Sequence, residues 1–112
     1  MQNSLAANRE LLAKRGICVI IPTYNNAGTI ADVVLRAMHQ CGDVIVVCDG
    51  CTDNTLGILH TLPSLPDIVN LKRNCGKGAA LKHGFRRALE RGFAYAITLD
   101  GEGKHFPEDI PL

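Results

Sequence analysis

Tyr-Ala-Ile-Thr-Leu-Asp-Gly-Glu-Gly-Lys-His-Phe-Pro, residues 95–107, is the stretch from which the fold of this chain is best worked out. The apolar run at residues 93–99 leads directly into two carboxylates one residue apart, Asp100 and Glu102. This pattern is typical of a strand that delivers acidic side chains to its carboxyl end. Open parallel sheets bind ligands just outside that end, where carboxylates can hold a hard cation against a substrate phosphate. The alternative is a polar turn that merely ends the strand, since Asp and Gly are ordinary turn residues.

Three further apolar runs precede this one and predict three more strands. Residues 17–21 read Ile-Cys-Val-Ile-Ile up to Pro22, residues 43–48 contain four consecutive Val or Ile residues, and residues 67–71 form a shorter run. Apolar runs without alternation are typical of strands buried on both faces of a parallel sheet. We therefore expect strands over these residues, the first of them ended by Pro22.

Helical spacing of apolar residues lies between the predicted strands. It predicts helices over residues 29–40, from Thr52 or Asp53 as a cap to about residue 60, and over residues 79–91. The last helix carries four apolar residues on one face, Leu81, Phe85, Ala88 and Leu89. Residues 1–16 predict a short helical extension before the first strand. Strands and helices that alternate with short loops predict an α/β sandwich with a parallel sheet.

Composition limits the classes of function. The 112 residues suffice for one domain, and 46% hydrophobic with 21% charged residues describe a globular protein with a core. A formal net charge of +1 gives no global attraction for nucleic acid, so any anion must be bound locally. No signal-peptide pattern or spanning run is evident, and five cysteines suit buried thiols in a reducing compartment. We expect a cytoplasmic protein.

Polar loops follow all four predicted strands, at residues 22–26, 49–53, 74–78 and 100–105. In a parallel sheet all four loops would lie along one edge. The need for turn residues alone does not readily explain why all four are polar. The segments that contain these loops read Val-Ile-Ile-Pro-Thr-Tyr-Asn at residues 19–25, Val-Val-Cys-Asp-Gly-Cys-Thr-Asp-Asn-Thr at 46–55, Asn-Cys-Gly-Lys-Gly-Ala-Ala-Leu at 74–81 and Leu-Asp-Gly-Glu-Gly-Lys-His-Phe-Pro at 99–107. Together they strongly resemble the four successive motifs of family 2 glycosyltransferases, especially the dolichol-phosphate mannosyltransferase and polyprenyl-phosphate glycosyltransferase branch.

The resemblance, which covers about residues 17–111, implies a fold and an activity. The fold would be a truncated GT-A fold, a Rossmann-like three-layer α/β sandwich whose mostly parallel sheet has the order 3-2-1-4. Residues 17–112 would form its nucleotide-sugar-binding part. The activity would be transfer of a sugar from a UDP- or GDP-sugar to a polyprenyl phosphate or another glycan acceptor, as in cell-wall biogenesis, with Mg or Mn as cofactor. The general base is expected beyond Leu112, so we assign no catalytic residue.

The same resemblance implies the residues of the site. The nucleotide-sugar-binding residues would be Pro22, Thr23, Tyr24, Asp49, Asn74, Gly76, Lys77, Gly78 and Asp100. The first three would line the base and ribose pocket, Asp49 would hydrogen-bond the base or ribose, and Lys77 would offset phosphate charge. The metal ligands would be Asp100, Glu102 and His105.

Four positions depart from the family pattern. Cys48 stands where the family usually has an acid, and Cys51 where it has Ser. Glu102 replaces the second Asp of the D-x-D motif and reaches about one methylene further. Lys104 stands where similar sequences have Gln, and its ammonium group would oppose a bound cation.

Other interpretations of the sequence are a catalytically incomplete nucleotide-binding module and a redox protein. Cys48 and Cys51 form a C-x-x-C pair between a strand and a helix, as redox pairs do, and a zinc site with His60 is a weaker possibility. Lys82, Arg86 and Arg87 form a basic helical face that is usually only solvated. In view of the resemblance, that face could instead meet anionic lipid at the inner side of the membrane. We expect no nucleic-acid partner, and self-association is possible.

Overall fold

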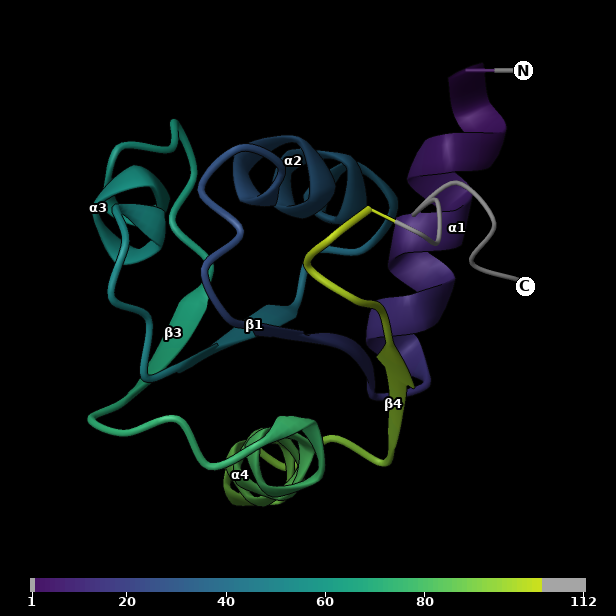
Figure 1. Cartoon of the computed structure of the whole chain (residues 1–112). Helices are drawn as coiled ribbons and strands as arrows, with labels where there is room; N and C mark the ends of the chain where they lie inside the picture. Colours follow the sequence, from purple (N-terminus) through teal and green to yellow (C-terminus); the bar gives the residue numbers. More distant parts are fainter. Residues whose placement is uncertain (1, 104–112) are drawn as a thin grey trace.

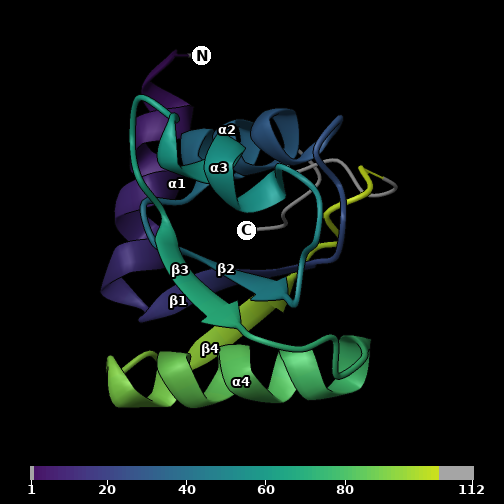
Figure 2. The same ribbon diagram turned by 60° about the vertical axis from the view of Figure 1, so that its left-hand side comes forward.

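The structure is a computed structural model that describes residues 2–103, and it is a three-layer α/β sandwich (Figure 1). Its elements in chain order are α1 (Gln2–Lys14), β1 (Ile17–Thr23), α2 (Ile30–Gln40), β2 (Val44–Asp49), α3 (Thr55–His60), β3 (Asp67–Leu71), α4 (Lys77–Glu90) and β4 (Tyr95–Thr98). Helices α2 and α3 cover one face of the sheet and α4 covers the other (Figures 1 and 2). Among residues 2–103, no helix has the length and apolar character needed to cross a membrane.

The sheet is parallel throughout and has the order β3-β2-β1-β4, which confirms the predicted order 3-2-1-4. Successive residues of β1 point into different layers, as a strand with a period of two requires. Val19 and Ile21 belong to the core cluster shared with α2, whereas Cys18 and Ile20 belong to the cluster under α4. Burial on both faces explains the uninterrupted apolar run at residues 17–21.

The prediction that Pro22 ends the first strand is wrong, because β1 continues to Thr23 and Pro22 pairs with Val47 of β2. The carbonyl of Ile20 accepts the N–H of Leu99, so the backbone of Ile20 faces β4. Two residues further on, Pro22 faces the same side, where the pairing with β4 has already ended. Proline is tolerated there because no ladder hydrogen bond needs its missing N–H.

Helix α1 contributes to the core. Leu12 is 1% exposed and joins the cluster between the sheet and α2, and the Arg9 guanidinium donates a hydrogen bond to the carbonyl of Met38 in α2. These two side chains therefore tie α1 to the core and to α2.

Helix α4 packs on the sheet through its smallest residues, of which the predicted apolar face included only Ala88. Its buried residues are Ala80, Gly84 and Ala88, spaced four apart, whereas Phe85 is 42% and Leu89 75% exposed. A Cβ atom on Gly84 would lie 2.5 Å from Cγ2 of Ile20 and 3.2 Å from Cγ2 of Val47. The helix therefore lies too close to the sheet for large side chains between them.

Replacing Gly84 with alanine should lower the free energy of unfolding by about 1–3 kcal/mol, because the added methyl group overpacks this contact. The measurement is urea unfolding followed by circular dichroism. Gly78→Ala in the same helix is the matched control, since its Cβ would meet nothing within 4 Å. The control should be neutral or gain up to about 1 kcal/mol from helix propensity. Equal stability of the two variants would contradict the close packing of α4.

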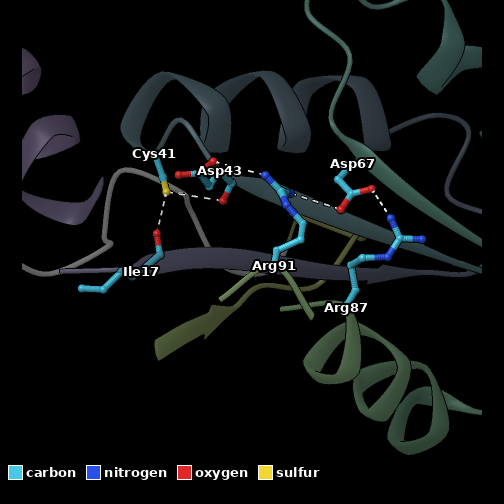
Figure 3. Close-up of polar contacts among 6 residues, drawn as sticks. All are labelled: Ile17, Cys41, Asp43, Asp67, Arg87 and Arg91. Carbon is cyan, nitrogen blue, oxygen red and sulfur yellow. Dashed lines mark hydrogen bonds and ion pairs between the residues drawn. The ribbon is translucent and has the colours of Figure 1, made fainter. Parts of the chain in front are cut away.

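Ion pairs tie the end of α4 to the amino ends of β2 and β3 (Figure 3). Nη1 of Arg87 lies 2.7 Å from Oδ1 of Asp67, and Nη1 of Arg91 lies 3.1 Å from its Oδ2. Arg91 also lies 3.6 Å from Oδ1 of Asp43, and its guanidinium lies 5.0 Å from the ring centre of Phe93. These contacts fasten the helix at the end of the sheet opposite to the polar loops.

Candidate functional site

The loops that follow the four strands meet at the carboxyl edge of the sheet, as predicted, and enclose a cavity of about 360 Å³. This volume lies in the range of about 300–1,000 Å³ that is usual for small-molecule sites. The residues that line it are Pro22, Thr23, Tyr24, Asn26, Asp49, Asn74, Gly76, Lys77, Ala80, Asp100, Gly101 and Glu102.

The cavity brings together most of the residues singled out in the sequence. Gly78 does not line it, because it follows Lys77 directly in α4 and therefore lies on a different side of the helix. His105 and Lys104 lie outside the described residues. Asn26, Ala80 and Gly101 were missed. Helical spacing from Lys77 could have indicated Ala80, which lies one turn further along α4 on the same face.

The loops after β1 and β2 are joined by Asn25 and Asp53. Asn25 has a φ of +52°, and its Oδ1 accepts the N–H groups of Thr52 and Asp53 at 2.8 and 3.1 Å. In return, Oδ2 of Asp53 accepts the N–H of Ala27 at 3.2 Å. The two loops therefore form one rigid wall beside the cavity.

Asp53 also stabilises the start of α3, but the prediction of Thr52 or Asp53 as the cap is wrong, because the helix begins at Thr55. Its Oδ1 accepts the hydroxyl of Thr55 at 2.5 Å and the N–H of the same residue at 2.9 Å. The Thr55 hydroxyl, together with the surrounding N–H donors, holds the pKa of the Asp53 carboxyl below its usual value. The helix N-cap itself is Asn54, whose side chain makes no capping bond.

Asp49 shapes the loop that leads into α4. Its side chain is 3% exposed, and its two carboxylate oxygens accept the N–H groups of Cys75 and Gly76 at 2.8 and 3.1 Å. Nδ2 of Asn74 donates to the carbonyl of Asp49 at 3.3 Å. The predicted contact of Asp49 with a base or ribose stays a prediction, whereas its contact with the loop is a feature of the fold.

Asp49→Asn should lower the free energy of unfolding by about 1–3 kcal/mol, because an amide cannot accept both N–H groups and its NH₂ would face a donor. Urea unfolding is the measurement. Asp32→Asn on α2 is the matched control, since the Asp32 side chain is 71% exposed and pairs with Arg36 at the surface. That control should change the stability by less than about 0.5 kcal/mol. If the Asp49 variant is as stable as the control, Asp49 does not hold the loop as described.

The acidic end of the cavity is formed by the residues after β4. The carbonyl of Gly101 accepts the hydroxyl of Thr29 at 2.7 Å, which fastens this turn to the start of α2. Oδ1 of Asp100 accepts the N–H of Glu102 at 2.9 Å, so the first carboxylate is oriented by the backbone of the second. Both carboxylates line the cavity.

These residues fit a divalent cation that is bound partly by a ligand. Within residues 2–103, no three His, Cys, Asp or Glu side chains are placed to hold a metal by themselves. Mg²⁺ commonly takes only one or two carboxylates and completes its shell with waters and substrate phosphates. Asp100 and Glu102 match that donor set, and Lys77 with the amino end of α4 borders the same cavity.

The raised pKa of the Cys48 thiol argues against a redox site at the C-x-x-C pair. Sγ of Cys48 lies 3.2 Å from Sγ of Cys51, and both are free thiols. Burial raises the pKa of the Cys48 thiol to about 12, with Cys51 as the next cause. Catalytic redox cysteines have a lowered pKa, because the thiolate is the nucleophile. Burial likewise raises the pKa of Cys18 to about 11.

Comparison with known proteins gives a consistent picture. Residues 18–112 match the sequence model of glycosyl transferase family 2. The chain is 35% identical over 98 residues to polyprenol monophosphomannose synthase of Mycolicibacterium smegmatis, covering 82% of this chain and 37% of that protein. It is 32% identical over 115 residues to the UDP-N-acetylglucosamine–dolichyl-phosphate N-acetylglucosaminyltransferase of Methanococcus voltae, covering 88% and 46%.

A third relative is the undecaprenyl-phosphate mannosyltransferase of Micrococcus luteus, 35% identical over 100 residues, covering 85% of this chain and 41% of that protein. The chain thus spans less than half the length of these three relatives.

Proposed function

The chain belongs to glycosyltransferase family 2, and from this premise we propose that its cavity binds the nucleoside diphosphate of a UDP- or GDP-sugar donor. The sugar would be transferred to a polyprenyl phosphate or another glycan acceptor, in line with the names of the relatives. The observation that carries the proposal is the composition of one cavity: two carboxylates line it together with a lysine at a helix N-terminus.

This combination suits a diphosphate better than a neutral ligand. Lys77 is the first residue of α4, where helix N–H groups and the helix dipole attract anions. A Cβ atom on Gly76 would meet nothing within 4 Å, so a ligand can approach the backbone there. We assign Lys77 and this backbone to the phosphates, where they offset negative charge.

Asp100 and Glu102 would hold a Mg or Mn ion against the same diphosphate. When bound, the cation supplies Lewis-acid stabilisation of the charge that develops on the departing nucleoside diphosphate. Asp100 is oriented for this task by the N–H of Glu102. We propose His105 as a third ligand on the resemblance alone.

The remaining lining residues would bind the nucleoside. Pro22 and Thr23 end β1 inside the cavity, and Tyr24, which is 47% exposed, offers an aromatic face beside them. We assign these three residues to the base and ribose, with Asp49 and Asn74 forming the adjoining wall. We assign no general base within residues 1–112. Residues 17–112 would be the donor-binding part and residues 1–16 an extension, in a protein of the cytoplasm or the inner face of the membrane.

Calorimetric titration with UDP and with GDP, each with and without manganese, tests the proposal. We expect one of the two nucleotides to bind, and to bind more tightly with the metal. ADP with manganese is the control for unspecific diphosphate binding, and it should bind more weakly than the preferred nucleotide. Failure of both UDP and GDP to bind would contradict the assignment of the cavity.

A further inference from the structure

Basic residues are concentrated in one segment of the chain. Residues 72–91 contain seven of the 12 Lys and Arg residues but only one of the 11 Asp and Glu residues, in a chain whose net charge is +1. The segment carries a formal charge of +6 and the remainder −5. It forms the loop into α4 and the helix itself, which covers its own face of the sheet (Figure 2).

The outer side of α4 interleaves these cations with large apolar residues. Lys82, Phe85, Arg86 and Leu89 follow one another at helical spacing and all are exposed. The sheet is contacted by the opposite side, through Ala80, Gly84 and Ala88. Phe85 and Leu89 are therefore not used to build the core. We call the four exposed residues the outer stripe of α4.

The cations of the outer stripe differ from the other arginines near the end of α4. Arg87 and Arg91 are occupied by Asp67, and Arg91 also by Asp43 (Figure 3). Within the described part of the chain, no carboxylate forms an ion pair with Lys82 or Arg86. Their charges therefore face outward together with two apolar side chains.

This combination fits one kind of partner. Interfacial helices insert apolar side chains at the boundary of headgroups and acyl chains while their Lys and Arg residues meet anionic headgroups. The phosphate backbone of a nucleic acid would attract the cations, but the exposed Leu89 side chain would add little to its binding. We propose that the outer stripe of α4 docks on an anionic lipid surface. The 14 residues of the helix span about 21 Å, enough to lie along such a surface with the cavity at its amino end.

Sedimentation with lipid vesicles tests this docking without any nucleotide. The chain should bind vesicles of phosphatidylcholine mixed with phosphatidylglycerol, bind phosphatidylcholine alone much more weakly, and lose affinity as salt is raised. Lys82→Glu with Arg86→Glu should weaken binding at least roughly 30-fold, since each basic residue near an anionic surface contributes about 1 kcal/mol. Phe85→Ser with Leu89→Ser should weaken it as well, through lost apolar insertion.

Lys14→Glu with Arg15→Glu is the matched control, because it makes the same charge change on two exposed residues at the end of α1. It should bind as the unchanged chain does, and circular dichroism should show every variant folded. Equal weakening by both charge variants, or no binding to anionic vesicles, would overturn the proposal. So would a dimer in solution that Phe85→Ser with Leu89→Ser converts to monomer while vesicle binding is unaffected. Failure of nucleotide binding would leave this result untouched, so the two proposals fail separately.

Discussion

Replacing Gly50 with alanine is expected to lower the free energy of unfolding by at least about 3 kcal/mol, more than Gly84→Ala or Asp49→Asn. Gly50 has a φ of +67°, in the left-handed region that L side chains rarely adopt. A Cβ atom there would lie 2.2 Å from the backbone nitrogen of Asn74 and 2.3 Å from the carbonyl carbon of Arg73. Because both neighbours are backbone atoms, the loop itself would have to move.

Gly92→Ala separates the two causes of this loss. Gly92 also has a positive φ, +83°, but a Cβ atom there would meet nothing within 4 Å. It should cost only the left-handed conformation, about 1–2 kcal/mol. Urea unfolding by circular dichroism measures both variants. If they lose equal stability, the contact between the loop after β2 and the loop before α4 is not as tight as described.

The Gly50 substitution should also weaken nucleotide binding in any fraction that remains folded. The displaced loop carries Asn74 and Gly76, which line the cavity. Asp49, the residue before Gly50, accepts the N–H of Gly76 and so holds this loop. A shift there would move the amino end of α4 and Lys77 with it. Titration with the preferred nucleotide under conditions where circular dichroism shows the variant folded is the measurement. An unchanged affinity would mean that the loop is not part of the donor site.

Asp100→Ala is expected to abolish the manganese-dependent part of nucleotide affinity, a loss of about 100-fold or more. Removing groups that only support a metal ligand commonly costs about 10–100-fold in affinity, so removing a ligand should cost at least as much. Binding measured without the metal should change little, because Asp100 would contact the nucleotide chiefly through the cation. Calorimetric titration with and without manganese separates these two effects.

Asp32→Ala is the control for the charge change, since Asp32 is an exposed acid on α2 and does not line the cavity. It should preserve both the affinity and its dependence on manganese. If Asp100→Ala shows the same manganese dependence as this control, the metal assignment is wrong while the nucleotide site can still stand. A loss that is equal with and without the metal would instead assign Asp100 to direct nucleotide contact.

Much of the site could be predicted because its residues follow strands with clear apolar runs. The runs before Pro22, Asp49 and Asp100 marked three strands, and parallel strands place their carboxyl ends at one edge. The third strand was predicted with the bounds that the structure has, Asp67–Leu71. The predicted helix at residues 79–91 instead runs over Lys77–Glu90. Its start differs because Gly76 and Lys77 read locally as a flexible glycine loop, whereas Asp49 holds that loop so that the helix begins there.

The sequence by itself determined the class of fold, the strand order suggested by the family motifs, and the gathering of the polar loops at one edge. Only the tertiary structure decided how close the layers lie, and therefore which side of α4 is buried. Apolar periodicity predicts Phe85 and Leu89 as core residues, but the short distance between α4 and the sheet leaves Ala80, Gly84 and Ala88 as the buried residues of the helix. The same holds for Asp49, whose partners Cys75 and Gly76 lie 26 and 27 residues away. The local sequence shows the chemistry of a side chain, whereas the contacts of that side chain depend on distances set by the packing of the whole chain.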